Sequence, residues 1–524
     1  MRVALLYTDN DPWALGMRNL SAALKKAGHH TKLILIGSNK KRYSNRVLEQ
    51  TKELVKDSDI IGISCLSRGS DKARQVIEYL HPLDKFIVWG GIHATLNPEA
   101  CANSADIVCR GEGEGMMLEL LERLQQGQQW KDIANAAYMD NGRIVVNPLR
   151  PLISDLDELP LIDFSCEDEF RLADRGFVRV SHISDETQRG EIIFMGARGC
   201  PLECTYCCNA KLKELFSGRG RYVRKTSMSK YIEHVKALRR SCPSGRYFLL
   251  IDDDFFARSV DELREFSKEF PRQVGLPFEC VASPLHITPE KMDLLVNAGL
   301  WRIRMGVESG SERTKREVYR RSISNEAVMR AANIISRYPQ VVAYYFFVIG
   351  NPYEQRKDLV ETARFMLNLP IPYYTVTYNL VLFPGSVLYE RAIRDRLIDG
   401  KQDSGYEIDF RSGLRYEGHT WKRKNLYLNG LLFLMEGKSS RHRLGALPRF
   451  LVPFLLHPKM VNFNDKHPVV IRCMIAIKMF TLSVRTCVAR LLKLFIEDPT
   501  SVYDLRRFIK SKLKSICGNP ASSI

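Results

Sequence analysis

Four cysteines lie within nine residues of one another near the middle of the chain, in the stretch GARGCPLECTYCCN. Cys200, Cys204 and Cys207 have the spacing C-x3-C-x2-C, and Cys208 follows directly. Three thiolates on one short loop can each bind one iron of a [4Fe-4S] cluster, which leaves the fourth iron open for a ligand from outside the protein. We predict that these three cysteines bind such a cluster and that Cys208 points away from it and stays a thiol.

Zinc is the alternative metal for a group of thiols, and cysteines that bind no metal are a second alternative. A zinc site would need a fourth ligand at a similar spacing, and the sequence contains no second C-x2-C pair. The chain has 13 cysteines, and it shows neither a recognisable signal peptide nor an apolar run of membrane-spanning length. Such a chain is typical of a reducing compartment, where clustered thiols more often bind metal than form disulfides, so we expect a cytoplasmic protein.

The cysteine loop follows the first of six short apolar segments that have the composition of buried strands. These segments are Ile192–Met195, Tyr247–Ile251, Phe278–Ala282, Arg302–Val307, Val342–Ile349 and Thr375–Leu382. A helix-like segment follows each of the first five, which predicts a partial (β/α)6, TIM-like barrel over residues 191–395. Barrel sites lie at the carboxyl ends of the strands, and Gly199 and Pro201 suit a loop that must curl around a cluster.

Residues 1–140 show an earlier alternation of strands and helices. The apolar segments RVALLYT, KLILIG, DIIGISCL and KFIVWGG are separated by amphipathic segments, and AAYMDNGRIVVN predicts a hairpin with an Asn-Gly turn. We therefore predict a doubly wound, flavodoxin- or Rossmann-like parallel sheet, and an α/β fold class for the chain. Residues 141–190 are rich in proline and acidic residues, which predicts a linker, and residues 396–524 are predicted to be a basic, mainly helical region.

The cysteine motif, with an aromatic residue before its third cysteine, resembles the signature of the radical S-adenosylmethionine superfamily. The resemblance covers residues 190–390 and implies that the open iron binds S-adenosylmethionine, whose reductive cleavage yields a 5′-deoxyadenosyl radical. It includes the stretches FLLIDDDFF, RMGVESGSE and FFVIGNPYE, each at the end of a predicted strand, although FLLIDDDFF departs from the Gly-Gly-Glu form of the family. The residues implied to contact S-adenosylmethionine are Tyr206, Asp252, Asp253, Glu308, Ser309 and Gly350.

The stretch DPWALG, after the first strand, resembles the D-x-H-x-x-G loop of cobalamin-binding domains, with Asp11, Trp13 and Gly16 at its three positions. Trp13 replaces the histidine that binds the cobalt from below in those domains. Because an indole only donates hydrogen bonds, the resemblance implies a cobalamin whose lower face this loop does not ligate. A flavodoxin-like domain without corrin is the alternative, since such motifs are short. The resemblance also implies cobalamin contacts after the third and fourth strands, at Ser64, Leu66, Gly90, Gly91 and His93.

The stretch RGEGEG, residues 110–115, has closely spaced glycines of the kind found in phosphate-binding loops. It lacks the lysine of a P-loop, and its glutamates would repel a phosphate. We therefore predict a turn that begins a helix and contributes no phosphate site.

The C-terminal region carries much of the net charge of +18, with 22 Lys and Arg against 9 Asp and Glu from Lys401 onward. On a helix, the cations of Val469–Phe495 fall on one side and leave a wide apolar face. Such a helix could lie on an anionic membrane, or it could dock on the barrel with its cations in water, and we favour docking. No motif for nucleic-acid binding accompanies the charge, so we expect no nucleic-acid partner.

The two resemblances together imply a cobalamin-dependent radical S-adenosylmethionine enzyme that methylates an unactivated carbon of a small-molecule or lipid-like substrate. They also imply an electron donor such as flavodoxin or ferredoxin. One alternative is radical cyclisation, rearrangement or oxidative ring formation without methyl transfer, which the mass of the product would distinguish. The other is a non-catalytic cobalamin- or cluster-binding sensor, which would form no 5′-deoxyadenosine.

Overall fold

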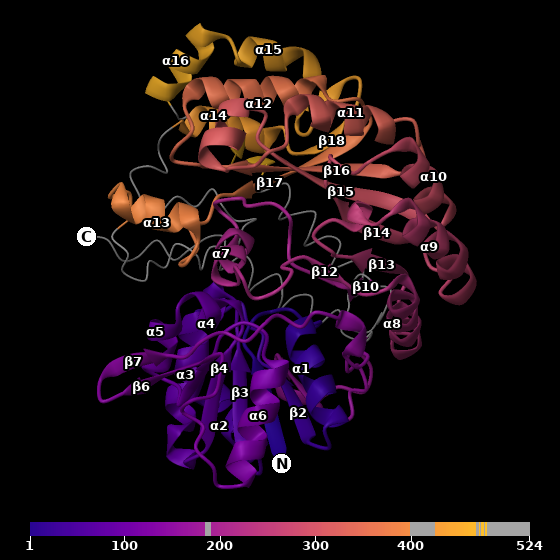
Figure 1. The fold of residues 1–524 in the computed structure, drawn as a ribbon. Coiled ribbons are helices and arrows are strands. Elements are labelled where there is room, and N and C mark those ends of the chain that lie inside the picture. Colours follow the sequence, from indigo (N-terminus) through magenta and orange to yellow (C-terminus); the bar gives the residue numbers. More distant parts are fainter. Residues whose placement is uncertain (184–189, 399–424, 468–470, 472, 476, 479–524) are drawn as a thin grey trace, which may run out of the picture.

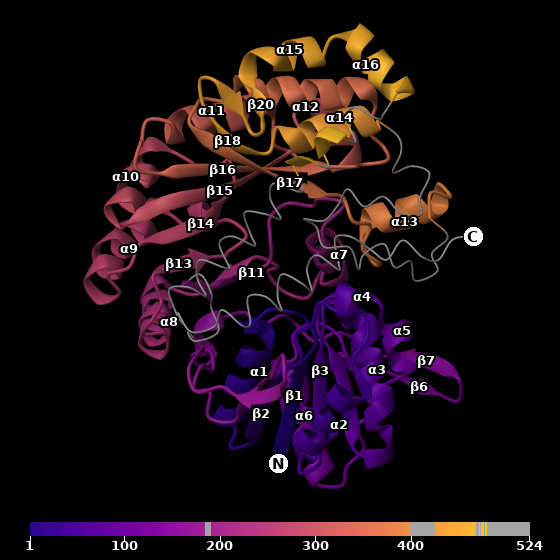
Figure 2. The ribbon, with the colours of Figure 1, turned by 180° about the vertical axis from the view of Figure 1, so that it is seen from behind.

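The structure is a computed structural model that describes residues 1–183, 190–398, 425–467, 471, 473–475 and 477–478. Within these residues the strands form two large sheets, which lie one above the other in Figure 1 and, seen from behind, in Figure 2. Each sheet is covered by helices of its own, and the first contains the N-terminus. This arrangement confirms the predicted α/β class, with a doubly wound unit followed by a partial barrel.

The first sheet has a parallel centre with the strand order β5-β4-β3-β1-β2, which is the order of a flavodoxin-like fold. The strands are β1 Arg2–Tyr7, β2 His30–Leu35, β3 Ile60–Ser64, β4 Phe86–Gly90 and β5 Ile107–Cys109. The connecting helices are α1 Leu15–Lys26, α2 Asn45–Val55, α3 Ser70–Leu80, α4 Ile92–Leu96, α5 Pro98–Ala102 and α6 Glu114–Gln125. The strand order reverses between β1 and β3, and ligands of such sheets bind beyond the carboxyl ends of the strands at that point.

Four further strands widen this sheet at its two edges. The predicted hairpin is confirmed as β6 Ala136–Asp140 and β7 Arg143–Val146, and its turn residues Asn141 and Gly142 have φ values of 48° and 76°. On the other edge, β8 Glu169–Ala173 pairs parallel to β2, and β9 Gly176–Arg179 pairs antiparallel to β8. Part of the segment predicted as a linker therefore contributes strands to the N-terminal sheet.

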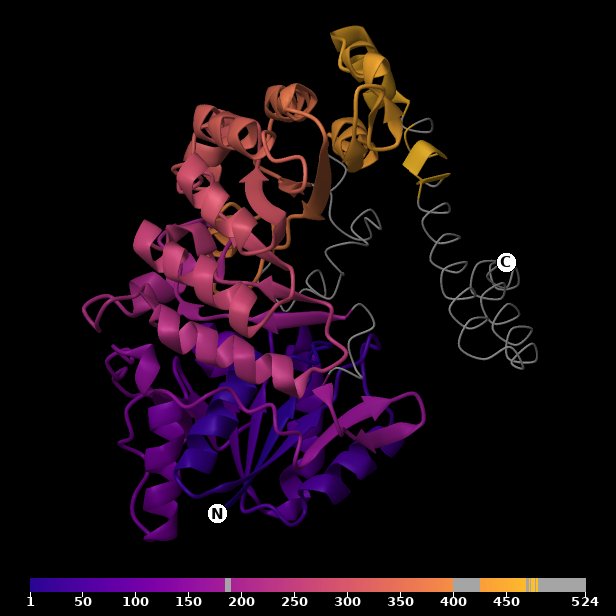
Figure 3. The same ribbon diagram turned by 90° about the vertical axis from the view of Figure 1, so that its right-hand side faces the viewer.

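The second sheet begins with six parallel strands in sequence order, which correspond to the six predicted segments. They are β10 Glu191–Phe194, β13 Tyr247–Leu250, β14 Phe278–Ala282, β15 Leu300–Glu308, β16 Val342–Ile349 and β17 Tyr373–Asn379. Five helices between them cover the outer face of the curved sheet (Figures 1 and 3). These helices are α8 Met228–Ser241, α9 Val260–Gln273, α10 Pro289–Asn297, α11 Asn325–Ile335 and α12 Arg356–Asn368.

Side-chain caps fix where several of these helices begin. Ser259 accepts a hydrogen bond from the backbone nitrogen of Glu262, and the Glu262 carboxylate accepts one from the backbone nitrogen of Ser259, which forms a capping box at the start of α9. Thr288 and Ser324 cap α10 and α11 in the simpler way, with one hydroxyl each. The polar residue before each apolar run thus sets the boundary between loop and helix.

The strand β15 shows how the barrel divides its side chains. Ile303, Met305 and Val307 are buried in the core beneath the helices. Arg302 and Arg304 lie on the other face, and both donate to Glu279 of β14, which is fully buried, at 2.9 and 2.7 Å. A buried carboxylate needs partners, and the two arginines provide them on the inner face of the barrel. The outer face of the same strand packs in the apolar core.

The described C-terminal residues extend the second sheet and cap one end of it. The helices α13 Val387–Arg394, α14 Leu426–Leu434, α15 Val452–Leu455 and α16 Pro458–Lys466 accompany the short antiparallel strands β18 Gly437–Ser439, β19 Arg443–Leu444 and β20 Leu447–Pro448. α14 packs against α12 and α16. Among the described residues, no helix has the length and apolar character required to cross a membrane.

The predicted basic amphipathic helix, Val469–Phe495, lies for the most part outside the described residues. Lys478 is the cation of that set which the structure describes. Its ammonium group donates to the carbonyl of Glu436 at 3.3 Å and lies 4.1 Å from the centre of the Phe433 ring, so it faces the protein. Burial lowers the pKa of Lys478 to about 8, with the Glu436 carboxylate opposing that shift.

Candidate active site

The cysteine loop is held between two short strands, β11 Ala197–Arg198 and β12 Arg224–Lys225, which pair antiparallel. Gly199 has a φ of 89°, and a Cβ atom there would lie 2.4 Å from the carbonyl oxygen of Tyr222, so only glycine fits this close approach. The chain then runs through Cys200 and Cys204 to Cys207, which precedes α7 Cys208–Leu215 as its N-cap residue. α7 lies between the two sheets (Figures 1 and 2).

The three motif cysteines differ in their surroundings. Burial raises the pKa of Cys200 to about 12 and raises that of Cys204 as well. A hydrogen bond from the Cys208 thiol lowers the pKa of Cys207 to about 7. Cys207 is therefore the thiol that ionises most readily at neutral pH, as expected at a helix N-terminus.

Cys208 contacts the neighbouring Cys207 thiol, whereas the sequence suggested that these two side chains diverge. The thiols of Cys207 and Cys208 are within hydrogen-bonding distance, and this contact raises the pKa of Cys208. The expectation assumed an extended chain, in which adjacent side chains diverge. Instead, Cys207 is extended and Cys208 is the first helical residue of α7, and this change of backbone conformation brings the two sulfurs to the same side.

The described residues contain no group of three His, Cys, Asp or Glu side chains close enough to bind a single metal ion. The structure therefore gives no support to the zinc alternative. The three cysteines nevertheless lie on one loop and interact electrostatically with one another. That donor set fits a [4Fe-4S] cluster, because each cysteine then binds a different iron and the sulfurs need not converge on one point.

A buried arginine contacts the cysteine loop from the opposite side. Arg321 Nη1 lies 3.5 Å from Cys204 Sγ, and its Nη2 donates to the carbonyl of Gly306 at 2.8 Å. Tyr206 packs edge-on against Tyr319, with 4.8 Å between the ring centres, and its hydroxyl donates to Glu308. Arg321 is not recognisable from the sequence, because Arg320 and Arg321 look like solvated cations and lie more than 100 residues from the cysteines in the chain.

Glu308 has an unusual backbone conformation at the end of β15. Its φ of 69° lies in the left-handed region, which non-glycine residues seldom adopt outside functional or tightly constrained positions. Burial raises the pKa of Glu308, while Arg321 and Tyr206 oppose that shift. The side chain is half-buried, so it remains accessible to a ligand at the mouth of the barrel.

The two acidic residues predicted at the end of β13 have different environments. Asp252 is buried, and it accepts from the backbone nitrogen of Gly196 at 2.6 Å and from Arg258 at 3.4 Å, so its carboxylate is occupied within the protein. Asp253 is exposed, receives a hydrogen bond from Asn209 of α7 at 3.4 Å and lies near Cys200. The structure thus leaves Asp253, and not Asp252, available beside the cysteine loop.

The remaining predicted barrel residues lie in a buried polar group behind the mouth. Ser309 is fully buried, and its hydroxyl contacts Glu354 at 3.3 Å and Thr362 at 3.1 Å. Gly350 has a φ of 73°, and its nitrogen donates to Asn429 of α14 at 2.8 Å. These residues support the strand ends, and the contact to α14 links them to the C-terminal region.

The loop after β1 holds Asp11, Trp13 and Gly16. Asp11 accepts a hydrogen bond from the backbone nitrogen of Trp13 at 3.0 Å. The Trp13 indole is only 1% exposed and packs edge-on against Phe164, with 5.9 Å between the ring centres, so it is buried in the core. No atom of the described part of the chain lies within 4 Å of a Cβ atom placed on Gly16.

The loops after β3 and β4 meet beside this loop. The backbone nitrogen of Leu66 donates to the buried carboxylate of Asp9, a residue that the sequence analysis missed because its role depends on a residue 57 positions away. Gly91 has a φ of 93°, and a Cβ atom there would lie 2.4 Å from Ser64 Oγ. Gly90 has no such restriction, since the nearest atom to a Cβ there is at 3.6 Å.

His93 lies just beyond the glycine pair and is buried. Its Nδ1 is 3.1 Å from Ser67 Oγ, and its Nε2 has no hydrogen-bond partner among the described residues. Burial lowers the pKa of His93 to about 4, so the imidazole is neutral at physiological pH. A buried nitrogen without a partner is uncommon in folded proteins and is consistent with a ligand at this edge.

Apolar side chains remain exposed at the carboxyl ends of both sheets. Leu66 and Ile92 follow β3 and β4 and are 39% and 41% exposed, whereas Met195 and Leu285 follow β10 and β14 and are 39% and 42% exposed. Large exposed apolar side chains that gather at strand ends mark a ligand or protein contact more often than isolated ones do. The residues present therefore fit a large, partly apolar cofactor between the two sheets.

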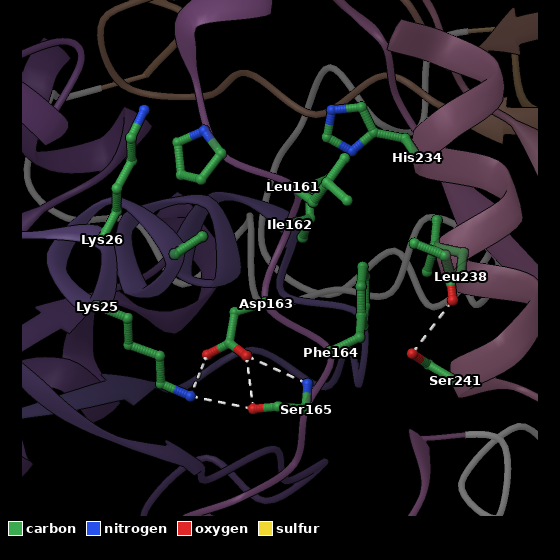
Figure 4. A pocket seen from close by; sticks show the side chains of 13 residues that line it. Lys25, Lys26, Leu161, Ile162, Asp163, Phe164, Ser165, His234, Leu238 and Ser241 are labelled. Atoms are coloured by element: carbon green, nitrogen blue, oxygen red, sulfur yellow. Dashed lines mark hydrogen bonds and ion pairs between the residues drawn. The ribbon is translucent and has the colours of Figure 1, made fainter.

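A cavity of about 480 Å³ lies elsewhere, between α1, residues 160–165 and α8 (Figure 4). Both of its lysines have partners, since Lys25 pairs with Asp163 at 2.9 Å and Lys26 donates to the backbone carbonyl of Glu158 at 3.2 Å. Burial lowers the pKa of His234, and the ring stacks on Phe194. This cavity is a seam in the packing of the two units and contains none of the predicted site residues.

The N-terminal unit and the barrel each match a different protein family. Residues 1–121 match the B12 binding domain, and residues 195–366 match the radical SAM superfamily. The first match spans β1 to β5, and the second begins just before the cysteine loop and extends into α12.

Three curated relatives resemble the chain over about two thirds of its length. An uncharacterized methyltransferase of Pyrococcus horikoshii is 28% identical over 65% of this chain and 71% of its own length. The cytidylyl-2-hydroxyethylphosphonate methyltransferase of Streptomyces wedmorensis is 24% identical over 65% of this chain and 69% of its own. The anaerobic magnesium-protoporphyrin IX monomethyl ester cyclase of Rubrivivax gelatinosus is 24% identical over 66% of this chain and 60% of its own.

The fold is also similar to a solved structure. The radical S-adenosylmethionine methyltransferase TsrM from Kitasatospora setae, solved with cobalamin and a [4Fe-4S] cluster bound, has a TM-score of 0.59 over 75% of each chain. The two sequences are 16% identical over this region, so the similarity is one of fold.

Proposed function

We propose that this chain is a cobalamin-dependent methyltransferase that acts on an unactivated carbon. The premise is that residues 195–366 match the radical SAM superfamily and residues 1–121, ahead of the barrel, match the B12 binding domain. The substrate is proposed to be a small or lipid-like molecule. A cluster would supply the electron that cleaves S-adenosylmethionine, and cobalamin would supply a methyl group to the substrate. The protein's part is to hold these groups close together and to exclude water and oxygen.

The observation that carries this proposal is the position of the cysteine loop opposite the carboxyl edge of the N-terminal sheet. α7, which begins at Cys208, contacts α4, which begins two residues after Gly90. Ligands of a doubly wound sheet bind at that edge, and those of a barrel bind at the carboxyl ends of its strands. The two proposed cofactor sites therefore face each other across a short gap, which is what transfer between them requires.

Within this proposal, three cysteines hold the cluster and Arg321 donates to the sulfur of one of them. Asp253 and Glu308 are the accessible carboxylates for the amino and ribose groups of S-adenosylmethionine. Asp252, Ser309 and Gly350 act behind them as supports. We assign cobalamin binding to residues 1–140 together with β8 and β9, and the radical reaction to residues 191–395.

On the cobalamin side, the proposal has no protein ligand for the lower face of the cobalt. Trp13 stands where an imidazole would be needed, and its side chain is turned into the core. Gly16, Leu66 and Gly91 provide the open space, apolar surface and close backbone approach that a corrin and its tail would use. His93 is a neutral hydrogen-bonding group at the same edge.

Labelled S-adenosylmethionine tests the proposal without knowledge of the substrate. The chain is reconstituted without oxygen with iron, sulfide and hydroxocobalamin, reduced, and supplied with S-adenosylmethionine carrying a trideuterated methyl group. We expect the corrinoid released from the protein to gain the mass of that labelled methyl group. A corrinoid that stays unlabelled while 5′-deoxyadenosine accumulates would instead favour cyclisation or rearrangement without methyl transfer, a function named for the Rubrivivax relative.

The proposed partners are an electron donor and, for the C-terminal region, either the barrel or a membrane. A low-potential protein such as flavodoxin or ferredoxin is the donor that the reaction needs. The contacts of Lys478 with Glu436 and Phe433 show that this one cation faces the protein, in keeping with the docking alternative. Absence of 5′-deoxyadenosine from a protein that has bound both cofactors would favour the sensor alternative.

A further inference from the structure

Two glutamates of the RGEGEG stretch contact the strands that flank the cysteine loop. Glu112 Oε1 accepts from Arg198 Nη1 at 2.9 Å and from Arg224 Nη1 at 3.0 Å. Glu114 Oε1 accepts from Arg198 Nη2 at 2.6 Å. The second oxygen of Glu112 accepts from the backbone nitrogen of Ile153 at 2.9 Å, in the segment that joins the two units.

These contacts reach both ends of the cysteine loop. Arg198 ends β11, two residues before Cys200, and Arg224 begins β12, where the loop returns. Glu112 lies in the turn that leads into α6 of the N-terminal unit, and Glu114 is the first residue of that helix. One carboxylate therefore joins the two ends of the loop to the other unit, and the second carboxylate fixes the orientation of the Arg198 guanidinium.

The four side chains are largely buried, and the most exposed of them, Arg198, has 24% of its surface accessible. Burial disfavours the charged form of Arg198, but Glu114 and Glu112 outweigh it and raise the pKa of this residue above its usual range. Arg198 donates from one guanidinium nitrogen to Glu112 and from the other to Glu114. Two such contacts away from water fix both distance and angle, unlike an exposed pair, which contributes little. The network therefore constrains the distances and angles between these four side chains.

A glycine in the same stretch brings the two units into direct contact. Gly111 has a φ of 86°, and a Cβ atom there would lie 2.5 Å from Phe216 Cζ. Phe216 ends α7, the helix that begins at Cys208, and it is buried. The backbone of the N-terminal unit thus lies directly against the helix that follows the cysteine loop.

We propose that Glu112 and Glu114 are positioning residues that fix the cysteine loop, and with it the cluster, relative to the carboxyl edge of the N-terminal sheet. This proposal rests on the proposed function, because the two groups whose relative position it concerns are the cluster and cobalamin. The glutamates contact neither group directly. They act through Arg198 and Arg224, and they are required for transfer between the sites while each site can still bind its own cofactor.

The test compares Glu114→Gln and the double variant Glu112→Gln, Glu114→Gln with Glu119→Gln as a matched control. Glu119 lies one turn further along α6 and pairs with Arg123 and Arg150, away from the cysteine loop. Glutamine keeps the volume and the acceptor oxygen but removes the charge. Each variant is reconstituted with iron, sulfide and hydroxocobalamin, and iron and corrinoid are counted per chain.

The first readout is the magnetic interaction between cob(II)alamin and the reduced cluster, measured by electron paramagnetic resonance, which reports the distance between them. We expect both cofactors to remain bound in all variants and the interaction to weaken and broaden in the double variant, less in Glu114→Gln and not in Glu119→Gln. An interaction that is the same in the double variant as in the wild type would overturn the proposal.

The second readout needs no cofactor and so separates this proposal from the proposed function. Amide hydrogen exchange of residues 199–215 is measured on the protein as purified, and we expect it to be at least about tenfold faster in the double variant than in the control. Wild-type protein that binds no cobalamin would count against the proposed function alone. Unchanged exchange would overturn the positioning role whatever the result with cobalamin.

Discussion

The three cysteines predicted to bind the cluster are recognisable from the sequence because their spacing is local. Arg321 and Asp9 are not, because the contacts that define them join residues far apart in the chain. The place of Trp13 in the sequence likewise does not reveal that its side chain is turned into the core, since this depends on Phe164 of the connecting segment. At the residue scale, the sequence predicts ligands but not the groups that surround them.

The adjacent cysteines give the first prediction. Cys207→Ala should lose most of its cluster, because it removes the thiol whose pKa is lowered to about 7 and which supplies a thiolate at neutral pH. Cys208→Ala should keep the cluster, because the raised pKa of that thiol leaves it protonated. Iron and sulfide per chain after anaerobic reconstitution measure both. Equal loss in the two variants would show that Cys208 is also a ligand.

Glu354 gives a prediction about pH. Burial raises its pKa from 4.5 to about 8, so the folded protein binds a proton that the unfolded chain has released between these values. Stability should therefore fall as pH rises from about 5 to about 8. Glu354→Gln should remove this part of the decline, because the amide cannot ionise.

Urea unfolding of the wild type and of Glu354→Gln at pH 6 and pH 8 measures the difference. From pH 6 to pH 8, the free energy of unfolding of the wild type should fall by about 1–3 kcal/mol more than that of the variant. A wild type and variant that change in parallel would show that Glu354 is ionised throughout.

At the scale of elements, the sequence predicts the six barrel strands because each is a short apolar run followed by a helical segment. It does not predict β8 and β9, since their alternation is interrupted by charged residues and is visible only when β8 pairs with β2. The RGEGEG stretch was correctly predicted to begin a helix, but its partners on β11 and β12 belong to another unit. Elements that depend on distant pairing are therefore the ones that the sequence does not reveal.

The glycine that begins the cysteine loop gives a prediction at this scale. Gly199→Ala places a Cβ atom 2.4 Å from the Tyr222 carbonyl oxygen at a φ of 89°, so β11 and β12 must separate. We expect a loss of about 1–3 kcal/mol of stability and a reduced iron content.

The matched control is Gly218→Ala, in the segment between α7 and β12. Its φ is 74°, but nothing lies within 4 Å of the added atom, so it tests backbone strain without the collision. It should retain its iron. If Gly199→Ala binds iron as well as this control does, the close approach to Tyr222 does not shape the cluster site.

At the scale of the whole molecule, the two units share buried residues as well as charges. Trp13 of the N-terminal unit belongs to the same buried cluster as the barrel core. Nearby, Arg18 is buried and pairs with Glu169 of β8 at 2.7 Å. The relative placement of the two sheets is therefore built into the core and does not depend on a flexible linker.

Substitution of the tryptophan tests this. Trp13→Ala should lower the free energy of unfolding by about 3–5 kcal/mol, because it leaves a large cavity beside Phe164, and Trp13→Phe should cost much less. The cob(II)alamin spectrum of Trp13→Phe should show no nitrogen coupling from a protein ligand. Nitrogen coupling from a protein histidine in the wild-type spectrum would contradict a lower face free of protein ligands.

The central claim is that Cys200, Cys204 and Cys207 hold a cluster with one iron open to S-adenosylmethionine. The most direct measurement is the electron paramagnetic resonance spectrum of the reduced, anaerobically reconstituted protein with and without S-adenosylmethionine. We predict a [4Fe-4S] signal whose shape changes when S-adenosylmethionine is added and which is absent when all three cysteines are replaced by alanine. A signal that survives the three substitutions, or that S-adenosylmethionine leaves unchanged, would contradict the claim.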